Sequence, residues 1–259
     1  MSVSARTRVF GLLGHPVRHS LSPAMYNALF ARYGIDAVYV AFDVLPSRAP
    51  AVADAIRTLD LVGVNLTVPF KERVLPHLDH LTAAAAEAGA VNVVIHIDGQ
   101  LTGYNTDGEG LCRSLEAEGH PLAGRSAILL GAGGTARAVA SALLDRGAAA
   151  ITLLNRSESR AQAAVNALGP RFPGATLRAG PLLAAAFAAA APDATLVVNC
   201  LAGGAEAQVE ALDPAALAAD AAGRQLLDGP TAPGRSLRRP RPALLHRPRH
   251  APAPGRPRL

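Results

Sequence analysis

The chain has 259 residues, half of them hydrophobic, which is enough to bury one or two cores of ordinary size. Its two cysteines, Cys112 and Cys200, do not make a disulfide framework, and no cysteine or histidine cluster has the spacing of metal ligands. Eight arginines and no acidic residue lie in residues 229–259, so the formal charge of +5 leaves −3 for residues 1–228. The body of the chain therefore lacks the basic character of a specific nucleic-acid binder.

Residues 229–259 form an arginine- and proline-rich tail, which we expect to be disordered because it has eight prolines and no periodicity. Two origins stay open for it: a basic arm that binds acidic partners non-specifically, and a shifted reading frame in a GC-rich gene. No uncharged apolar run reaches membrane length, and the start of the chain lacks a signal-peptide pattern. We therefore expect a cytoplasmic protein without a membrane partner.

Strand and helix patterns alternate along the first part of the chain. Apolar runs predict strands at residues 9–13, 37–44 and 61–68, and a hairpin of residues 91–97 and 100–103 around the Asp98-Gly99 turn. Helices are expected from Ser22, with Ser22-Pro23 as cap and first turn, over residues 49–59, and over residues 107–119, with Asp107 as a candidate N-cap. The change of pattern near residues 104–108 predicts a domain boundary.

A second alternating series begins at residue 126. Apolar runs predict strands at residues 126–130, 149–154 and 195–198, and an alanine run around Phe187 predicts a helix packed on a sheet. Residues 166–178 resemble a loop. The fold class predicted for the whole chain is α/β, with domains at residues 1–106 and 107–228.

A glycine motif follows the strand at residues 126–130. The run GAGGTARAV has the pattern G-x-G-x-x-A, in which Gly131 permits a tight turn, Gly133 a close approach of phosphate, and Ala136 close packing of helix and sheet. The helix N-terminus after the turn presents unpaired N–H groups to phosphate. A purely structural turn is the alternative, but the strand context favours a Rossmann-like dinucleotide site.

The next predicted strand ends in Asn155, Arg156 and Ser157, with Arg160 one turn further on. An acidic residue at this place would bind the ribose 2′-hydroxyl, whereas arginines suit a 2′-phosphate. The sequence therefore predicts NADP rather than NAD. The expected cofactor contacts are Gly131, Ala132, Gly133, Gly134, Thr135, Asn155, Arg156, Ser157 and Arg160.

Lys71 is the only lysine among 25 basic residues. An arginine keeps its proton, whereas the pKa of a lysine can be adjusted for acid or base work. A single lysine beside the Asn-x-Thr of NLTVPFK therefore suggests proton transfer at Lys71, although one lysine can also remain by chance. Ser20 and Ser22, around a helix start, form a candidate anion site for a substrate carboxylate.

Six motifs follow one another in an order and at intervals that resemble shikimate dehydrogenase, the NADP-dependent enzyme of aromatic amino-acid biosynthesis. They are GHPVRHSLSP, NLTVPFK, GAVN, GYNTDGEG, GAGGTARAV and NRSESR, within residues 8–200. The resemblance implies an N-terminal substrate domain, a C-terminal Rossmann-like NADP-binding domain and an open cleft between them. It also implies the reversible reduction of 3-dehydroshikimate to shikimate.

The resemblance also assigns roles by position. Ser20 and Ser22 would hold the substrate carboxylate, Lys71 would donate and accept the proton, and the ring hydroxyls would contact Asn65, Thr67, Asn92 and Asp107. Lys71 and Asp107 are thus the candidate catalytic residues. No metal is implied, and a homodimer is a candidate assembly.

The chain also departs from the family pattern. The strand end at Asn199 continues as Cys-Leu-Ala-Gly-Gly, and the Gly-Met-Leu segment and last helix of the family have no counterpart after Asp228. Residues 226–229 are a candidate last remnant of the pattern. Three functions stay open: shikimate dehydrogenase, impaired or not by the tail; a dehydrogenase of quinate or an aminoshikimate; and a non-catalytic nucleotide-binding relic with a basic tail.

Overall fold

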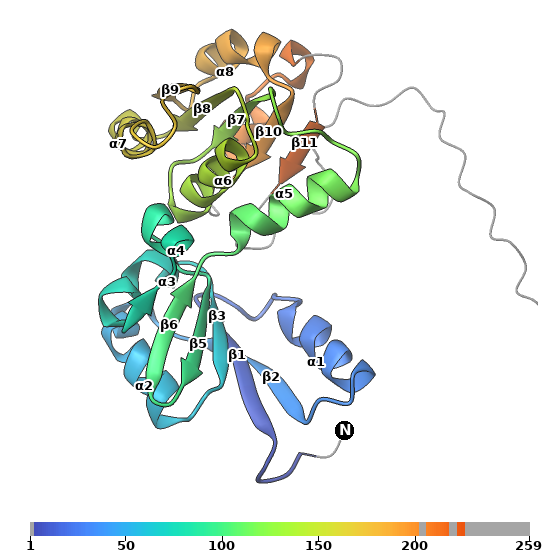
Figure 1. Ribbon diagram of the computed structural model, residues 1–259, viewed down its shortest axis with the longest axis vertical. Helices are drawn as coiled ribbons and strands as arrows, with labels where there is room; N and C mark the ends of the chain where they lie inside the picture. Colours follow the sequence, from blue (N-terminus) through green and yellow to red (C-terminus); the bar gives the residue numbers. More distant parts are fainter. Residues whose placement is uncertain (1–2, 202–205, 218–221, 226–259) are drawn as a thin grey trace, which may run out of the picture.

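The computed structural model describes residues 3–201, 206–217 and 222–225. These residues form two β-sheets, and helix α5 (Asp107–Ala117) follows the first sheet and precedes the second in the chain (Figure 1). The predicted α/β fold class is confirmed. The tail at residues 229–259 and the candidate remnant at residues 226–229 lie outside the described residues.

The first sheet has six strands in the order β2-β1-β3-β5-β6-β4. The strands are β1 (Arg8–Gly14), β2 (Ala37–Asp43), β3 (Gly63–Leu66), β4 (His80–Leu81), β5 (Val93–Ile97) and β6 (Gln100–Tyr104). β1 runs parallel to β2 and β3, whereas β5 runs antiparallel to β3 and β6. The ends of β1, β3 and β6 and the start of β5 therefore share one edge of the sheet.

Helices cover both faces of this sheet (Figure 1). They are α1 (Ser22–Arg32), α2 (Val52–Thr58), α3 (Phe70–Arg73) and α4 (Ala83–Ala88), with 3-10 turns η1 (Pro46–Ala51) and η2 (Leu75–His77). Phe30 of α1 is buried against one face, in a cluster with Tyr39. Ile56 of α2 and Phe70 of α3 are buried against the other face.

Two local predictions for the first part were wrong in detail. The N-cap of α1 is Leu21 rather than Ser22, which is the first helical residue, and the cap makes no side-chain hydrogen bond. The helix expected over residues 49–59 begins as the 3-10 turn η1, because it contains Pro46 and Pro50 and proline removes a backbone donor. The Asp98-Gly99 hairpin is confirmed, with both residues at positive φ.

The second sheet is entirely parallel, with the order β11-β10-β7-β8-β9. Its strands are β7 (Ser126–Leu130), β8 (Ala150–Asn155), β9 (Thr176–Pro181), β10 (Leu196–Asn199) and β11 (Ala222–Gln225). The further helices are α6 (Gly134–Asp145), α7 (Glu158–Leu168), α8 (Ala184–Ala190) and α9 (Glu206–Glu210), with η3 (Ala191–Asp193) and η4 (Pro214–Ala216). This arrangement is typical of a Rossmann-like fold.

Helices lie on both faces of the second sheet. Leu115 of α5, Val139 of α6 and Ala161 of α7 belong to one buried cluster, and Phe187 of α8 belongs to another. The helix predicted around Phe187 is thus confirmed. The loop expected over residues 166–178 is confirmed only for residues 169–175, because α7 continues to Leu168 and β9 begins at Thr176, paired with β8. None of the described helices is long and apolar enough to cross a membrane.

Candidate functional site

Lys71 lies in α3, just beyond the end of β3, rather than on the strand itself. The chain turns after Leu66, where Phe70 N donates a hydrogen bond to Thr67 O, and the short helix begins. The lysine is buried, with 9% of its surface exposed, and its Nζ lies 2.8 Å from Asp107 Oδ2. A buried ammonium needs such a partner, so the two candidate catalytic residues form one ion pair.

Asn92 and Thr106 hold the second oxygen of the Asp107 carboxylate in place. Asn92 Nδ2 donates to Asp107 Oδ1 at 2.6 Å and to Thr106 Oγ1 at 3.0 Å, and Thr106 N donates to Asn92 Oδ1. Asp107 is the first residue of α5 and Thr106 is the N-cap, so the expectation that Asp107 caps the helix was wrong. Its carboxylate is engaged by side chains instead.

Asn65 joins the same hydrogen-bond network through the backbone carbonyl of Asn92. Its Nδ2 donates to Asn92 O at 3.4 Å, and its Oδ1 accepts a hydrogen bond of 2.7 Å from Tyr39 OH. Burial, and to a smaller extent the neighbouring Tyr26, raises the pKa of Tyr39, so the phenol keeps its proton and remains a donor to Asn65. Asn65 is therefore held in one amide orientation.

Thr67, Ser20 and Ser22 lie at the same edge of the first sheet as the Lys71 network. A Cβ added at Gly14 would lie 2.2 Å from Thr67 Cγ2, so the end of β1 lies directly beside Thr67. Ser20 Oγ accepts a hydrogen bond from Ser22 N at 3.2 Å, and both serines are half-buried. Their role in binding a carboxylate stays a prediction.

The glycine turn joins β7 to α6, as the motif predicted. Gly131 has a φ of +113°, and a Cβ there would meet Cys200 O at 3.2 Å, so the position favours glycine. Ala132, within the turn, is buried, and Gly133 is the N-cap of α6. Gly134, the first residue of α6, has its N–H bonded to Glu72 Oε1 at 3.1 Å.

Glu72 places a carboxylate at this helix N-terminus. The same oxygen accepts from Arg137 at 3.1 Å, and Glu72 Oε2 lies 3.6 Å from a guanidinium nitrogen of Arg160. The turn already binds an anionic oxygen from its own chain, which is the chemistry that a dinucleotide phosphate requires. The residues present therefore fit an NADP pyrophosphate.

Replacing Glu72 with glutamine is expected to tighten NADP binding about threefold to tenfold, equivalent to roughly 0.7–1.4 kcal/mol, because it removes a negative charge that competes with phosphate. Titration of the variant with NADP in a calorimeter measures the change. Glu116→Gln is the matched control, because Glu116 also pairs with an arginine, Arg146, but on α5. Equal or weaker NADP binding by Glu72→Gln would contradict this prediction.

The candidate 2′-phosphate site follows β8. Asn155 Nδ2 donates to Ser157 O at 2.9 Å, which shapes the turn into α7, and Ser157 Oγ lies 2.8 Å from Ser159 Oγ. Arg156 and Arg160 are exposed. Two arginines with accessible guanidinium groups thus lie beside the glycine turn, as the 2′-phosphate prediction requires.

Thr135, predicted as a cofactor contact, also touches the ion pair. Its Oγ1 lies 3.2 Å from Lys71 Nζ and donates to Asp107 Oδ2 at 3.0 Å. The sequence analysis missed four contacts to the predicted site residues. They are made by Tyr39, Glu72, Thr106 and Thr135, the last of these to Lys71 and Asp107. None of the four carried a sequence signal for these contacts, because each contact joins residues that are far apart in the chain.

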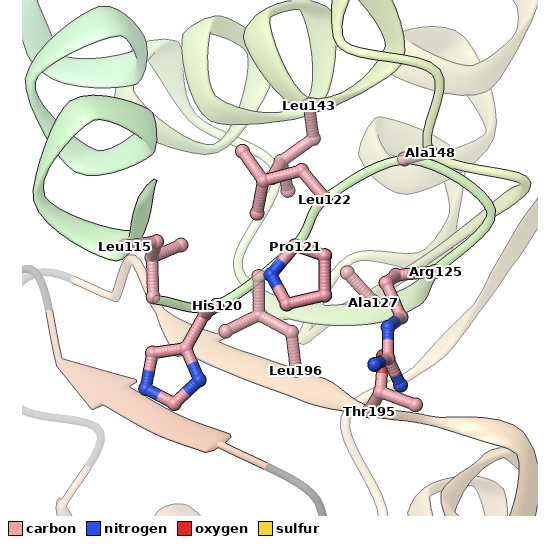
Figure 2. Close-up of a pocket in the computed structure, with 10 residues that line it drawn as sticks. All are labelled: Leu115, His120, Pro121, Leu122, Arg125, Ala127, Leu143, Ala148, Thr195 and Leu196. Carbon is pink, nitrogen blue, oxygen red and sulfur yellow. The ribbon is translucent and has the colours of Figure 1, made fainter. Parts of the chain in front are cut away.

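One pocket lies away from this network. It has a volume of about 50 Å³, is partly open to solvent, and lies at the starts of β7 and β10, the sheet edge opposite the glycine turn. Figure 2 shows apolar side chains between His120 and Arg125; the lining residues are Leu115, His120, Pro121, Leu122, Arg125, Ala127, Leu143, Ala148, Thr195 and Leu196. This pocket shares no residue with the predicted site.

Comparison with known families gives two matches. Residues 12–94 match the shikimate dehydrogenase substrate binding domain, and residues 114–178 match shikimate/quinate 5-dehydrogenase. The chain is 48% identical over 204 residues to a shikimate dehydrogenase (NADP(+)) of Symbiobacterium thermophilum, covering 78% of this chain and 69% of that protein. The matches cover 55% to 64% of seven other curated shikimate dehydrogenases.

Solved structures agree with these matches. A Thermus thermophilus shikimate 5-dehydrogenase in complex with NADP(H) and shikimate is similar with a TM-score of 0.69 and 39% identity, over 81% of this chain and 75% of that one. A quinate dehydrogenase from Corynebacterium glutamicum in complex with NAD has a TM-score of 0.71 and 33% identity, over 83% of this chain and 78% of that one. The similarity thus extends across both sheets.

Proposed function

Because the chain belongs to the shikimate dehydrogenase family, a family of NADP-dependent oxidoreductases, we propose that it catalyses the reversible reduction of 3-dehydroshikimate to shikimate. The observation that carries the proposal is the buried Lys71–Asp107 pair, which contacts Thr135 of the glycine turn. A proton-transfer group and a dinucleotide turn thereby share one site.

NADPH, when bound, supplies the hydride for the carbonyl carbon. Gly131, Gly133 and Gly134 would hold its pyrophosphate, and Arg156 and Arg160 its 2′-phosphate. These assignments rest on the open space beside Gly133, where the nearest atom to an added Cβ is Glu72 Oε1 at 3.9 Å, and on the anionic oxygen that Gly134 N already binds.

Lys71 supplies the proton that the developing alkoxide needs. The ammonium donates from Nζ, and Asp107, 2.8 Å away, orients it and stabilises its charged form. Asn92 fixes the other carboxylate oxygen, so that Asp107 cannot rotate away. Ser20, Ser22, Asn65, Thr67 and Asn92 are the proposed substrate-binding residues.

The proposal is tested by following NADPH absorbance after adding 3-dehydroshikimate to the full chain. Oxidation of NADPH that depends on both 3-dehydroshikimate and protein is the expected result. Absence of turnover with a chain that still binds NADPH would favour the non-catalytic relic. Binding to nucleic acid that disappears on deleting residues 229–259 would favour a role for the tail.

Arg160→Ala and Arg156→Ala are each expected to weaken NADP binding about tenfold or more while changing NAD binding little, since a charge-assisted hydrogen bond to the 2′-phosphate contributes roughly 1.5–3 kcal/mol. Dissociation constants for both cofactors, measured side by side, check this. Arg113→Ala, which removes an exposed arginine of α5 paired with Glu109, is the control. Parallel losses for NADP and NAD would argue against a 2′-phosphate contact.

A dehydrogenase of quinate is the second candidate, favoured by the similarity to the Corynebacterium glutamicum quinate dehydrogenase. Quinate and aminoshikimates differ from shikimate at ring substituents, close to the groups assigned to Asn65, Thr67 and Asn92. A panel of shikimate, quinate and aminoshikimate, each with NADP and NAD, separates these activities by kcat/KM.

Three further features belong to the proposal. Residues 1–106 would form the substrate domain and 107–228 the NADP domain, which is supported by α5 joining the two sheets. An open cleft between them, a cytoplasmic location and a homodimer remain predictions. Limited proteolysis tests the boundary, and light scattering tests the assembly.

A further inference from the structure

Thr135 connects the two halves of the site. It is the second residue of α6, at the glycine turn, yet its hydroxyl contacts Lys71 from the first sheet and Asp107 from α5. The distances are 3.2 Å to Lys71 Nζ and 3.0 Å to Asp107 Oδ2. The three groups form a closed triangle, because Lys71 Nζ and Asp107 Oδ2 also bond to each other at 2.8 Å.

The chemistry of the three groups fixes the direction of each hydrogen bond. An ammonium only donates, a carboxylate only accepts, and a hydroxyl can do both. Thr135 therefore accepts from Lys71 and donates to Asp107. An alanine or valine at this position would keep the helix start but lose both bonds.

We propose that Thr135 is a positioning residue that sets the orientation and protonation of Lys71 from the dinucleotide turn. The inference rests on the proposed function, in which Lys71 transfers the proton. Gly134, whose N–H is assigned to the pyrophosphate, directly precedes Thr135. A shift of this helix start would therefore move the cofactor-binding N–H and the hydroxyl that contacts Lys71 together. Thr135 thereby couples the position of the Lys71 ammonium to the binding of the hydride donor.

Two substitutions test the proposal by kinetics. Thr135→Val removes the hydroxyl at nearly constant volume and is expected to lower kcat about tenfold, with KM for 3-dehydroshikimate and the NADPH dissociation constant within about twofold of the parent. Its kcat profile is expected to shift toward lower pH, since the ammonium loses an acceptor. Thr135→Ser keeps the hydroxyl and is expected to restore both kcat and the pH profile.

A second measurement does not depend on turnover. Lys71 is the only lysine of the chain, so acetylation by an amine reagent, followed by mass spectrometry of its peptide, reports on one side-chain amine. Thr135→Val is expected to be labelled at lower pH than the parent, and Thr135→Ser at the parental pH. A shifted labelling profile in a chain that fails to reduce 3-dehydroshikimate would support the coupling and refute the proposed function.

Several results would overturn the inference. An unchanged kcat and labelling profile in Thr135→Val would remove the positioning role. Loss of kcat that Thr135→Ser does not restore would indicate a packing effect. A large loss of NADPH affinity with unchanged Lys71 labelling would instead make Thr135 a cofactor contact.

Discussion

Lys71→Met is expected to lower kcat by a factor of about 10²–10⁴, the range that general acid-base catalysis contributes, while NADPH affinity stays within about twofold. The reason is that methionine fills the buried position but has no proton to deliver from the place where Nζ meets Asp107. Steady-state kinetics with 3-dehydroshikimate, together with NADPH titration, measures both effects. Thermal unfolding of the variant shows whether the fold is retained.

Two controls separate proton transfer from charge and from local damage. Lys71→Arg keeps a positive charge that is not released, so it is also expected to be severely impaired. Arg73→Met changes an exposed residue of the same short helix, whose guanidinium donates a hydrogen bond to Pro46 O, and this variant should retain activity. Normal turnover in Lys71→Met would eliminate this residue as the proton donor.

Gly108→Ala is expected to destabilise the protein by about 3 kcal/mol, at the upper end of overpacking costs. A Cβ at Gly108 would lie 2.2 Å from Ala138 O and 2.8 Å from Ala142 Cβ, so α5 and α6 would have to move apart. The obstacle at Ala138 is backbone and cannot rotate away. For a chain of this size we expect the melting temperature to fall by roughly 6–12 °C.

Gly110→Ala provides the matched comparison on the same helix. No atom lies within 4 Å of a Cβ added there, so alanine should be neutral or stabilise the helix by up to about 1 kcal/mol. Calorimetric unfolding should therefore give a lower melting temperature for Gly108→Ala than for Gly110→Ala. Equal melting temperatures would show that α5 and α6 can move apart at little cost in free energy. Activity should fall in Gly108→Ala as well, because Asp107 is its neighbour.

The sequence predicted the parts of the site that depend on local pattern. Lys71, Asn92 and Asp107 follow or precede strands that share one sheet edge, and the glycine motif fixes a strand-to-helix turn by backbone geometry alone. The glycine positions and the Lys71 region could therefore be located before any contact was known.

The missed contacts depend on how the two sheets pack together. Nothing around Thr135 or Glu72 in the sequence indicates that one meets Lys71 and the other meets the glycine turn, because both contacts cross between the halves. β9 was missed for a different reason: its residues TLRAGP include glycine and proline, which are poor strand formers, and pairing with β8 overrides that preference.

The two halves have separate buried clusters, and charged side chains make several of the hydrogen bonds between them. Arg137 bonds to Glu72 and to Gly89 O, and Arg171 bonds to Glu87. Such partly exposed bonds weaken with dissolved electrolyte, whereas apolar cores do not. The placement of one half against the other is therefore expected to be more sensitive to ionic strength than the folding of either sheet.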